Sequence, residues 1–382
     1  MARWNLPPLT GRVALIVLVA IALVGVLMAW LYTNSVRSAL LVPRSDQPEY
    51  DLEVVAVAGG RIILPRTEAT TREGVWGIET EDAYGQLTAI VGIVEDQVEW
   101  TYESIVGTIA SGDEVAIDAD AYPGDPLIAH GLGFEQIRLP GELGAMPAWL
   151  IEGRNPIWVV IAHDRETDSF TQSLRIIPAL VEEGYSVLVV PYRNDAGSPK
   201  SESGLRTWGL TEWRDIDAAL SRIDPDGIQE YVLIGHDMGA EVVSTFLHES
   251  ERVGRVLGVV FDSPVVDMGE VVDGVSSWMP APIRFLGNHL ARVRFGMDWP
   301  ALDQVSRADE FDVPVLVLHG ARDTVVPFAA SAAFVSARPD LFEMVRFEKA
   351  GHDDLWNTDP ARYETSVLEF LNRVTSTAST TS

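Results

Sequence analysis

Tyr231-Val-Leu-Ile-Gly235-His-Asp237-Met-Gly239-Ala-Glu-Val-Val243 is the stretch of this 382-residue chain that decides the fold. Its apolar start predicts a buried β-strand that stops at Gly235, and the apolar spacing after Gly239 is that of a helix. Two glycines at this spacing are expected where the backbones of a strand and a helix pass too closely for side chains. The stretch therefore predicts a strand, a sharp turn centred on Asp237, and a helix.

Two later strand ends carry an acid and a histidine. Val313-Pro-Val-Leu-Val-Leu-His319-Gly320-Ala-Arg-Asp323 is a buried-type strand followed by a loop that holds Asp323. Phe347-Glu-Lys-Ala-Gly351-His352 is a strand that ends in His352. A nucleophile turn followed by an acid and then a histidine is the chain order of the α/β-hydrolases.

On these motifs, the sequence resembles the α/β-hydrolase superfamily over about residues 157–373, with aspartate in place of the elbow serine. It is most similar to membrane-anchored actinobacterial α/β-hydrolases, which also share the stretches 122–126, 147–150 and 211–215. The resemblance implies a doubly wound, mostly parallel sheet. It also implies that Asp237 stands at the nucleophile position, with Asp323 as the orienting acid and His352 as the base.

The resemblance further implies an oxyanion hole made of backbone amides. One amide would be that of Met238, and the second would come from Asp164 or Arg165 in the loop after the strand at 157–162. The family usually has His-Gly in that loop, whereas this chain has His163-Asp164. A side chain at position 164 brings negative charge toward the place where negative charge must develop.

Asp237 leaves two interpretations open. Epoxide hydrolases and haloalkane dehalogenases, which the turn also resembles, use this aspartate to attack an sp³ carbon, and histidine-activated water then cleaves the ester. However, Met238 stands where dehalogenases commonly have tryptophan, and residues 264–310 contain none of the tyrosines of epoxide hydrolases. The alternative is a pseudoenzyme that binds a ligand or protein partner, with Asp237, Asp323 and His352 kept as an ion-pair network.

Several other residues are weaker candidates for a role in the site. Asp262, after the preceding strand, is an alternative orienting acid, and Ser263 and Ser173 are alternative nucleophiles. His236, His163 and His319 are expected to be packed or structural. No spacing predicts three converging zinc ligands, and there is no phosphate-binding loop or dinucleotide fingerprint. The sequence therefore predicts neither a metal nor a cofactor.

Residues 1–33 are predicted to form a transmembrane anchor. The run Val13–Tyr32 carries no charge and has the length of about 20 residues that crosses a bilayer as a helix. A cleaved signal peptide would have a shorter apolar centre and a small-residue cleavage site, which Trp30 and Tyr32 do not provide. The arginines on the two sides favour the N-terminus inside. We therefore expect a single-pass membrane protein with an extracytoplasmic catalytic domain.

The rest of the chain is expected to divide into four parts. Residues 34–49 are read as a linker, 50–153 as a β-rich region, 154–374 as the hydrolase domain with a cap insertion at about 264–310, and 375–382 as a disordered tail. The tryptophans of the cap favour a small, largely apolar substrate, although packing within the cap explains them equally well. The cap also holds Arg284, Arg292 and Arg294, either as a solvated helix face or as a contact for anionic lipid or a substrate carboxylate.

Composition limits the choice of partners. The chain has 28 basic and 56 acidic residues, a net charge of −28, which argues against nucleic acid. It contains no cysteine, so disulfides and thiolate chemistry are excluded. The sequence does not predict an oligomeric state.

Overall fold

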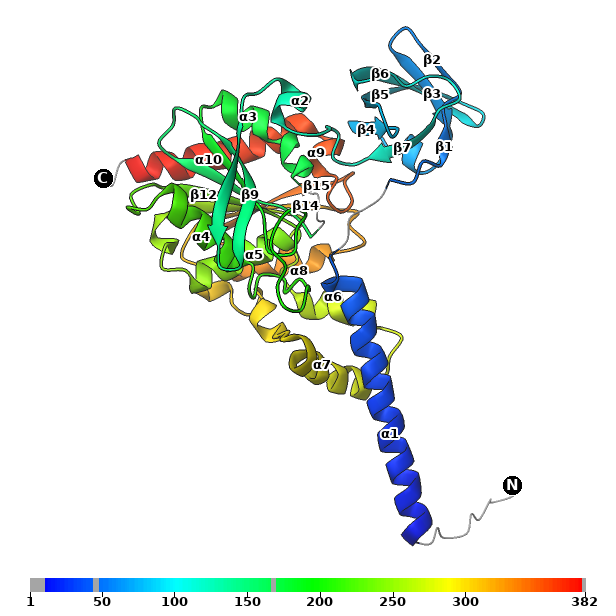
Figure 1. The fold of residues 1–382 in the computed structure, drawn as a ribbon, viewed down its shortest axis with the longest axis vertical. Helices are drawn as coiled ribbons and strands as arrows, with labels where there is room; N and C mark the ends of the chain where they lie inside the picture. Colours follow the sequence, from blue (N-terminus) through cyan, green and yellow to red (C-terminus); the bar gives the residue numbers. More distant parts are fainter. Residues whose placement is uncertain (1–10, 44–47, 166–169, 380–382) are drawn as a thin grey trace.

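Two β-sheets and one protruding helix organise the chain (Figure 1). The computed structural model describes residues 11–43, 48–165 and 170–379. A seven-stranded sheet forms the N-terminal domain and an eight-stranded sheet the C-terminal domain. Helix α1 (Gly11–Val36) runs away from both.

The N-terminal sheet is antiparallel throughout, with the order β1-β7-β4-β5-β6-β3-β2. Its strands are β1 (Leu52–Glu53), β2 (Ala56–Ala58), β3 (Arg61–Pro65), β4 (Trp76–Glu79), β5 (Tyr84–Val94), β6 (Gln97–Val106) and β7 (Glu114–Asp118). Gly59 and Gly60, with φ of 58° and 73°, form the β2–β3 turn. Both residues need the left-handed conformation that glycine adopts at no steric cost. The predicted β-rich region is confirmed.

The C-terminal sheet has the order β15-β14-β13-β12-β10-β11-β9-β8. Its strands are β8 (Glu135–Gly141), β9 (Gly144–Ile151), β10 (Trp158–Ala162), β11 (Ser186–Val190), β12 (Tyr231–His236), β13 (Val256–Asp262), β14 (Val315–Gly320) and β15 (Phe342–Phe347). The strands from β10 onward are parallel, and the β8–β9 hairpin joins the edge of β11 in antiparallel register. The expected boundary at residue 153 is therefore wrong, because 135–151 pair with the C-terminal sheet. A hairpin looks the same in sequence whichever sheet it joins.

Helices cover both faces of this sheet, as the strands that are apolar throughout require. The helices of this domain are α2 (Pro126–His130), α3 (Ile177–Glu182), α4 (Trp213–Ile223), α5 (Met238–Glu249), α6 (Met268–Val275), α7 (Ala281–Phe295), α8 (Phe328–Ala337), α9 (Leu355–Thr358) and α10 (Pro360–Ser379). One core lies between the sheet and α4, α5 and α8, and the other between the sheet and α3 and α10. The predicted doubly wound α/β fold is confirmed.

Helix α1 enters the body instead of ending in a tether. It continues as a π-helical turn, Arg37–Leu41, in which Leu40 and Leu41 are buried in the core of the C-terminal domain. The carbonyl of Leu40 accepts a hydrogen bond of 2.9 Å from the indole of Trp208. The expected linker at 34–49 is therefore wrong as far as residue 41, because its apolar residues pack; residues 44–47 lie outside the described residues.

The predicted disordered tail at residues 375–382 is wrong in part. Helix α10 continues to Ser379, so residues 375–379 are helical and not disordered. Residues 380–382 lie outside the described residues, as do residues 1–10 of the expected anchor. The cap insertion lies between β13 and β14 and contains α6 and α7. Helix α7 packs against α1 (Figure 1).

Candidate active site

The C-terminal sheet brings Asp237, Asp323 and His352 together. They follow β12, β14 and β15, and the carboxyl ends of parallel strands lie at one edge of a sheet. Nδ1 of His352 lies 2.9 Å from Oδ2 of Asp323, and Nε2 lies 3.5 Å from Oδ1 of Asp237. The imidazole thus bridges two carboxylates that are 86 residues apart in the sequence.

The turn at Asp237 is backbone-strained and tightly packed. Asp237 has φ 45° and ψ −107°, a conformation that non-glycine residues seldom adopt. A Cβ on Gly239 would lie 2.1 Å from the carbonyl oxygen of Ala162, and one on Gly235 would lie 2.6 Å from the amide nitrogen of Ala240. Both glycines are therefore required by the close approach of strand and helix, as the sequence predicted.

The Asp323 carboxylate is fully buried and well bonded. Its Oδ1 accepts hydrogen bonds of 2.8 Å from the amides of Val325 and Val326, and Oδ2 lies 3.4 Å from Nε2 of His319. Burial would raise the pKa of Asp323, but the hydrogen bonds from His319 and His352 hold it well below its usual range. Asp323 therefore stays ionised and can fix the orientation of the imidazole.

His352 is held as a cation. Burial would lower the pKa of His352, but the carboxylates of Asp353, Asp237 and Asp323 together raise it to about 12. At neutral pH the imidazole is therefore protonated, because it lies between the carboxylates of Asp237 and Asp323. It can act as a base only after one of those anions is neutralised.

Asp353 is a neighbour of the site that sequence reasoning missed. With φ 56°, its backbone turns back so that Oδ2 lies 3.6 Å from Nε2 of His352. Burial raises the pKa of Asp353 well above its usual value, His352 lowers it, and the charges of Asp237 and Asp164 raise it further. In the sequence, only its position directly after His352 indicates that Asp353 could lie near the site. The positive φ that turns its side chain toward the imidazole cannot be predicted from the sequence.

The residues expected to form the oxyanion hole lie on two elements. Met238 begins α5, so its amide belongs to the helix N-terminus, where the first N–H groups have no partner within the helix. Asp164 and Arg165 follow β10 and are half-buried. Asp164 raises the pKa values of both Asp353 and Asp120, although burial is the largest cause in each case. It therefore adds negative charge to this end of the sheet. The rest of that loop, 166–169, lies outside the described residues.

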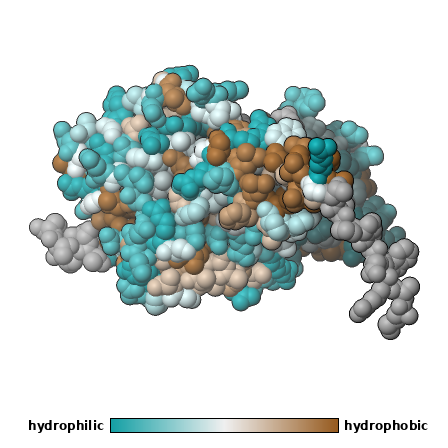
Figure 2. Space-filling view, turned by 90° about the horizontal axis from the view of Figure 1, so that it is seen from below, coloured by the Kyte–Doolittle hydropathy of each residue, from teal (hydrophilic) through white to brown (hydrophobic). Residues whose placement is uncertain are grey.

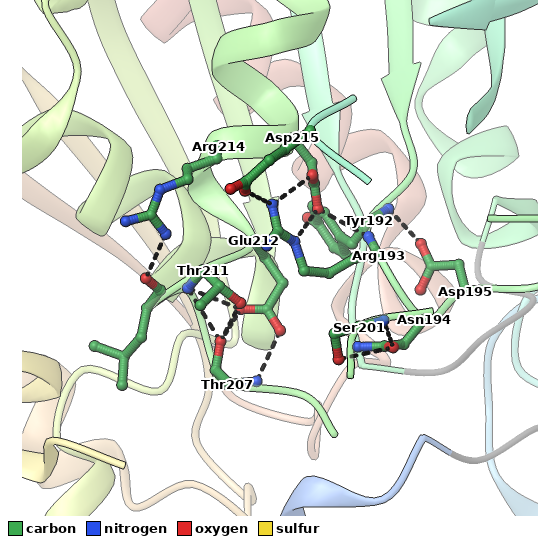
Figure 3. A network of polar contacts seen from close by, with 12 residues as sticks. Tyr192, Arg193, Asn194, Asp195, Ser201, Thr207, Thr211, Glu212, Arg214 and Asp215 are labelled. Atoms are coloured by element: carbon green, nitrogen blue, oxygen red, sulfur yellow. Dashed lines mark hydrogen bonds and ion pairs between the residues drawn. The ribbon is translucent and has the colours of Figure 1, made fainter. Parts of the chain in front are cut away.

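A buried polar network holds the start of this loop. Nε2 of His163 lies 3.0 Å from Oδ2 of Asp195, and its Nδ1 lies 2.8 Å from the carbonyl oxygen of Asp164. The hydroxyl of Tyr192 donates to the carbonyl of His163 over 3.1 Å. Figure 3 shows Tyr192 and Asp195 beside the ion pair of Arg193 with Asp215. The position of His163 is therefore fixed by packing and hydrogen bonds.

The bonds of Asp262 and Ser263 go to residues other than His352, and Ser263 accepts from the amide of Asp353 over 3.3 Å. Asp262, the alternative acid, lies 3.3 Å from Nδ1 of His236. Ser263 is buried and donates to Oδ1 of Asp262 over 3.0 Å, and Ser173 is buried within the short helix Thr171–Arg175. The acid in contact with His352 is therefore Asp323.

The loop that carries His352 is braced from outside the sheet. Arg175 donates to the carbonyl of Asp353 over 2.9 Å, and Asp354 accepts from the amide of Gly351 over 2.6 Å. Arg72, from the N-terminal domain, forms an ion pair with Asp354. The side-chain amide of Asn357 donates to the carbonyls of Val75 and Ala119. Sequence reasoning missed Arg72 and Arg175, because no local pattern reports contacts between residues that are far apart in the sequence.

Within the described ranges, no group of three histidine or carboxylate side chains is arranged to hold a metal ion. The chemistry open to the cluster is that of the aspartate, the imidazole and the backbone amides. A carboxylate beside a protonated imidazole can act as a nucleophile with a proton donor, or it can form a static ion pair.

Comparison with solved structures identifies the fold. The esterase Pf2001 of Pyrococcus furiosus matches with a TM-score of 0.52 and 21% identity, over 66% of this chain and 96% of that chain. A puromycin-hydrolyzing peptidase of Mycobacterium tuberculosis matches with a TM-score of 0.52 and 17% identity, over 83% of this chain and 46% of that chain. Together with the sheet order and the strand-end cluster, these likenesses show that the chain has the α/β-hydrolase fold.

Sequence comparison gives relatives that match less than half of this chain. Protein ABHD12B of Homo sapiens is 27% identical over 183 residues, covering 45% of this chain and 47% of that protein. An uncharacterized protein of Mycobacterium tuberculosis is 28% identical over 175 residues, covering 45% of this chain and 54% of that protein. The chain thus spans about half the length of these relatives. A family model described as a domain of unknown function, DUF8805, matches residues 53–118, which contain most of the N-terminal sheet.

Proposed function

We propose that this protein is a membrane-anchored hydrolase acting on a small, largely apolar substrate, with Asp237 as the nucleophile. His352 is the acid–base residue, and Asp323 orients it. The observation that carries the proposal is the position of the His352 imidazole, with Nε2 3.5 Å from Asp237 and Nδ1 2.9 Å from Asp323. This is the arrangement of a nucleophile, a base and an orienting group.

The high pKa of His352 fits a nucleophile that begins as an anion. In the first step the Asp237 carboxylate attacks an sp³ carbon, the bond from that carbon to its leaving group breaks, and an ester forms on Asp237. An oxygen leaving group can take the proton from the protonated imidazole. Esterification removes the charge of Asp237, one of the carboxylates that raise the pKa of His352. When an oxygen leaving group has taken the proton, the imidazole is neutral and able to act as a base; after loss of a halide, the imidazolium first passes its proton to solvent.

The second step returns the enzyme to its starting state. Neutral His352 removes a proton from water, and the resulting hydroxide attacks the carbonyl carbon of the Asp237 ester. The negative charge that develops on the ester oxygen would be met by the Met238 amide at the positive end of α5. The bond between the carbonyl carbon and the alcohol oxygen then breaks, and the departing alkoxide takes the proton of the new carboxyl group of Asp237. Asp237 is again a carboxylate, and it retains one oxygen atom from water.

The membrane part of the proposal rests on α1. Among the described residues it is the one helix long and apolar enough to cross a membrane, and most of its residues before Ala29 are exposed in the monomer. Its C-terminal end is built into the body, because Tyr32 and Val36 are fully buried. The end of this helix packs in the core of the protein, and these contacts support a retained anchor over a cleaved signal peptide.

Two observations favour a different function, that of a ligand- or protein-binding pseudoenzyme. Asp164 adds negative charge near the place where the second oxyanion donor would lie, and Asp237 is only 3% exposed. A carboxylate held permanently by His352 would leave a stable ion-pair network and an inherited pocket. In that case the chain would bind a ligand and not turn it over.

Turnover by the full chain separates the two functions. We would assay a panel of epoxides, alkyl halides and esters with the wild-type protein, with Asp237→Asn, and with Asp226→Asn, a control on an exposed loop. The proposal predicts wild-type turnover that falls by about 10⁴-fold in Asp237→Asn, as when a triad member is disabled, and persists in the control. No wild-type turnover, combined with new esterase activity in Asp237→Ser, would support the pseudoenzyme.

A further inference from the structure

Helix α7 of the cap is a basic helix on an acidic protein. Between Ala281 and Phe295 it carries three arginines and a histidine but no aspartate or glutamate, whereas the chain as a whole has twice as many acidic as basic residues. Of the arginines of this helix that form ion pairs, Arg292 has the more exposed side chain: 61% of it is exposed, beside Asp298. Asp273 and Asp298, outside the helix, pair with Arg284 and Arg292 over 3.7 and 2.9 Å and offset part of this charge. The positive charge that remains on the helix is suited to an anionic surface.

The same helix exposes large apolar side chains. Phe285 is 80% exposed, Val293 is 72% exposed and Leu286 is 40% exposed, and Trp278 just before the helix is 61% exposed. Among the described tryptophan and phenylalanine residues, those with exposed side chains are Trp30, Trp278 and Phe285. All three therefore belong to α1 and the cap segment packed against it. Exposed apolar side chains gathered in one place indicate a binding surface.

Contacts with α1 fix the level of α7 along the anchor. The ring of Tyr32 packs so closely on Gly287 that a Cβ there would lie 2.2 Å from it, and the Tyr32 hydroxyl donates to Asn288. Arg294 donates to Asn34 over 3.0 Å, and its guanidinium lies 5.6 Å from the ring centre of Trp30. Helix α7 is therefore held beside residues 30–34 of α1.

This level is where the exposed apolar part of α1 ends. The uncharged residues 13–32 make a helix of about 30 Å, close to the thickness of the hydrocarbon core of a bilayer. Trp30 is then at the depth where aromatic side chains gather at membrane interfaces. Figure 2, which looks from the end at which α1 begins, shows apolar surface gathered on this face of the molecule. The cap helix beside Trp30 must lie at the same depth.

We infer that α7 and Trp278 form an interfacial membrane-binding surface, in which Phe285 and Val293 enter the lipid boundary and the arginines contact anionic phospholipid head groups. An apolar face combined with basic residues is the composition of helices that lie in the plane of a membrane. The inference rests on α1 crossing the bilayer and is independent of any chemistry at Asp237. It gives the cap a fixed position against the lipid surface.

The absence of cysteine from the sequence allows a direct depth measurement. Nitroxide labels would be attached to three single-cysteine variants of the full chain in phospholipid vesicles: Phe285→Cys, Leu18→Cys in the exposed part of α1, and Val94→Cys. Val94 is 71% exposed at the end of β5, in the domain that Figure 1 shows at the opposite end from the start of α1. Accessibility to a water-soluble relaxation agent is then compared among the three.

The inference predicts that the labels at positions 285 and 18 are shielded from the aqueous agent, while the label at position 94 is accessible. A label at 285 as accessible as that at 94, with position 18 shielded, would overturn the inference and leave the anchor standing. Exposure of position 18 as well would overturn both. In neither case is the proposed catalysis affected, because turnover of the panel is measured separately.

Lipid charge gives a second, independent readout. The full chain in mixed vesicles should associate more with spin-labelled phosphatidylglycerol than with phosphatidylcholine, and Arg292→Gln should reduce the preference by about fivefold, the factor for one basic residue at an anionic surface. Arg222→Gln, at an exposed position near the end of α4, is the matched control and should leave the preference unchanged. Equal association with both lipids, or an equal loss in the control, would contradict a role for the arginines.

Discussion

Nε2 of His352 lies 3.5 Å from Oδ1 of Asp237, an aspartate held in a strained turn between a strand and a helix. The opposite ring nitrogen lies 2.9 Å from the buried carboxylate of Asp323. Because a cation between two anions is stable, the protonated His352 between the Asp237 and Asp323 carboxylates is the resting state of the site. The proposed chemistry begins when Asp237 gives up its charge to a substrate.

Replacement of Asp237 should lower the pKa of His352. Asp237 contributes both a hydrogen bond and a charge that raise it, so Asp237→Asn removes the charge while preserving the shape. Titration of the His352 imidazole by NMR checks this in wild type, Asp237→Asn and the Asp226→Asn control. An unchanged His352 titration in Asp237→Asn would mean that the two side chains are not coupled.

Stability should fall at alkaline pH because of His352. Its pKa is raised from 6.5 to about 12 in the folded state, so the stabilisation is fully present below about pH 6.5 and is lost as the pH rises toward 12. The free energy of unfolding, measured by urea denaturation of the full chain in detergent, should decrease over this window. His352→Gln should flatten the decrease, and equal slopes in both proteins would contradict the assignment.

The ion pair between Arg72 and Asp354 should position the histidine loop. Arg72→Gln removes the ion pair with Asp354, which joins the two domains. Asp354 also accepts a hydrogen bond from the amide of Gly351, the residue directly before His352. Because the Arg72 side chain is 44% exposed, we expect a loss of at most about 1 kcal/mol in stability but faster hydrogen exchange at Gly351.

Lys349→Gln is the matched control for Arg72. Lys349 pairs with Glu73 across the same two segments, but both side chains are at least 70% exposed, so the pair should contribute little. Exchange at Gly351 should be unchanged in this variant. Equal exchange in Arg72→Gln and wild type would show that the N-terminal domain does not hold the loop.

Gly239→Ala should be strongly destabilising. The added Cβ would meet the carbonyl oxygen of Ala162 at 2.1 Å, and backbone on both sides must move. We expect a cost of about 3 kcal/mol, measured by thermal or urea unfolding. Gly254→Ala, where nothing lies within 4 Å of the new Cβ, should be close to neutral. A similar effect of both substitutions would argue against the tight crossing of β10 and α5.

Local patterns predicted the C-terminal sheet and the three side chains at its edge. The apolar strands, the paired glycines and the order of Asp237, Asp323 and His352 are each visible over a few residues. The partners of the site could not be predicted in this way. Asp353 reaches His352 only because its φ is positive, and Arg72 comes from another domain.

The errors in domain organisation have the same origin. The β8–β9 hairpin alternates like the strands of the N-terminal domain, but its edge partner is β11. Residues 34–41 follow an apolar span, and their sequence predicts a linker. Leu40 and Leu41 are nevertheless buried in the core. Which surface buries an apolar residue is decided by tertiary packing, which a single sequence does not report.

A single turnover in ¹⁸O-labelled water tests the nucleophile most directly. The wild-type protein reacts, in excess, with the first substrate that the panel identifies. It is then digested, and the mass of the peptide containing Asp237 is measured by mass spectrometry. The account predicts one ¹⁸O atom in the carboxylate of Asp237, because water attacks the ester at that carbon. Label found only in the product, with an unlabelled Asp237 peptide, would contradict it.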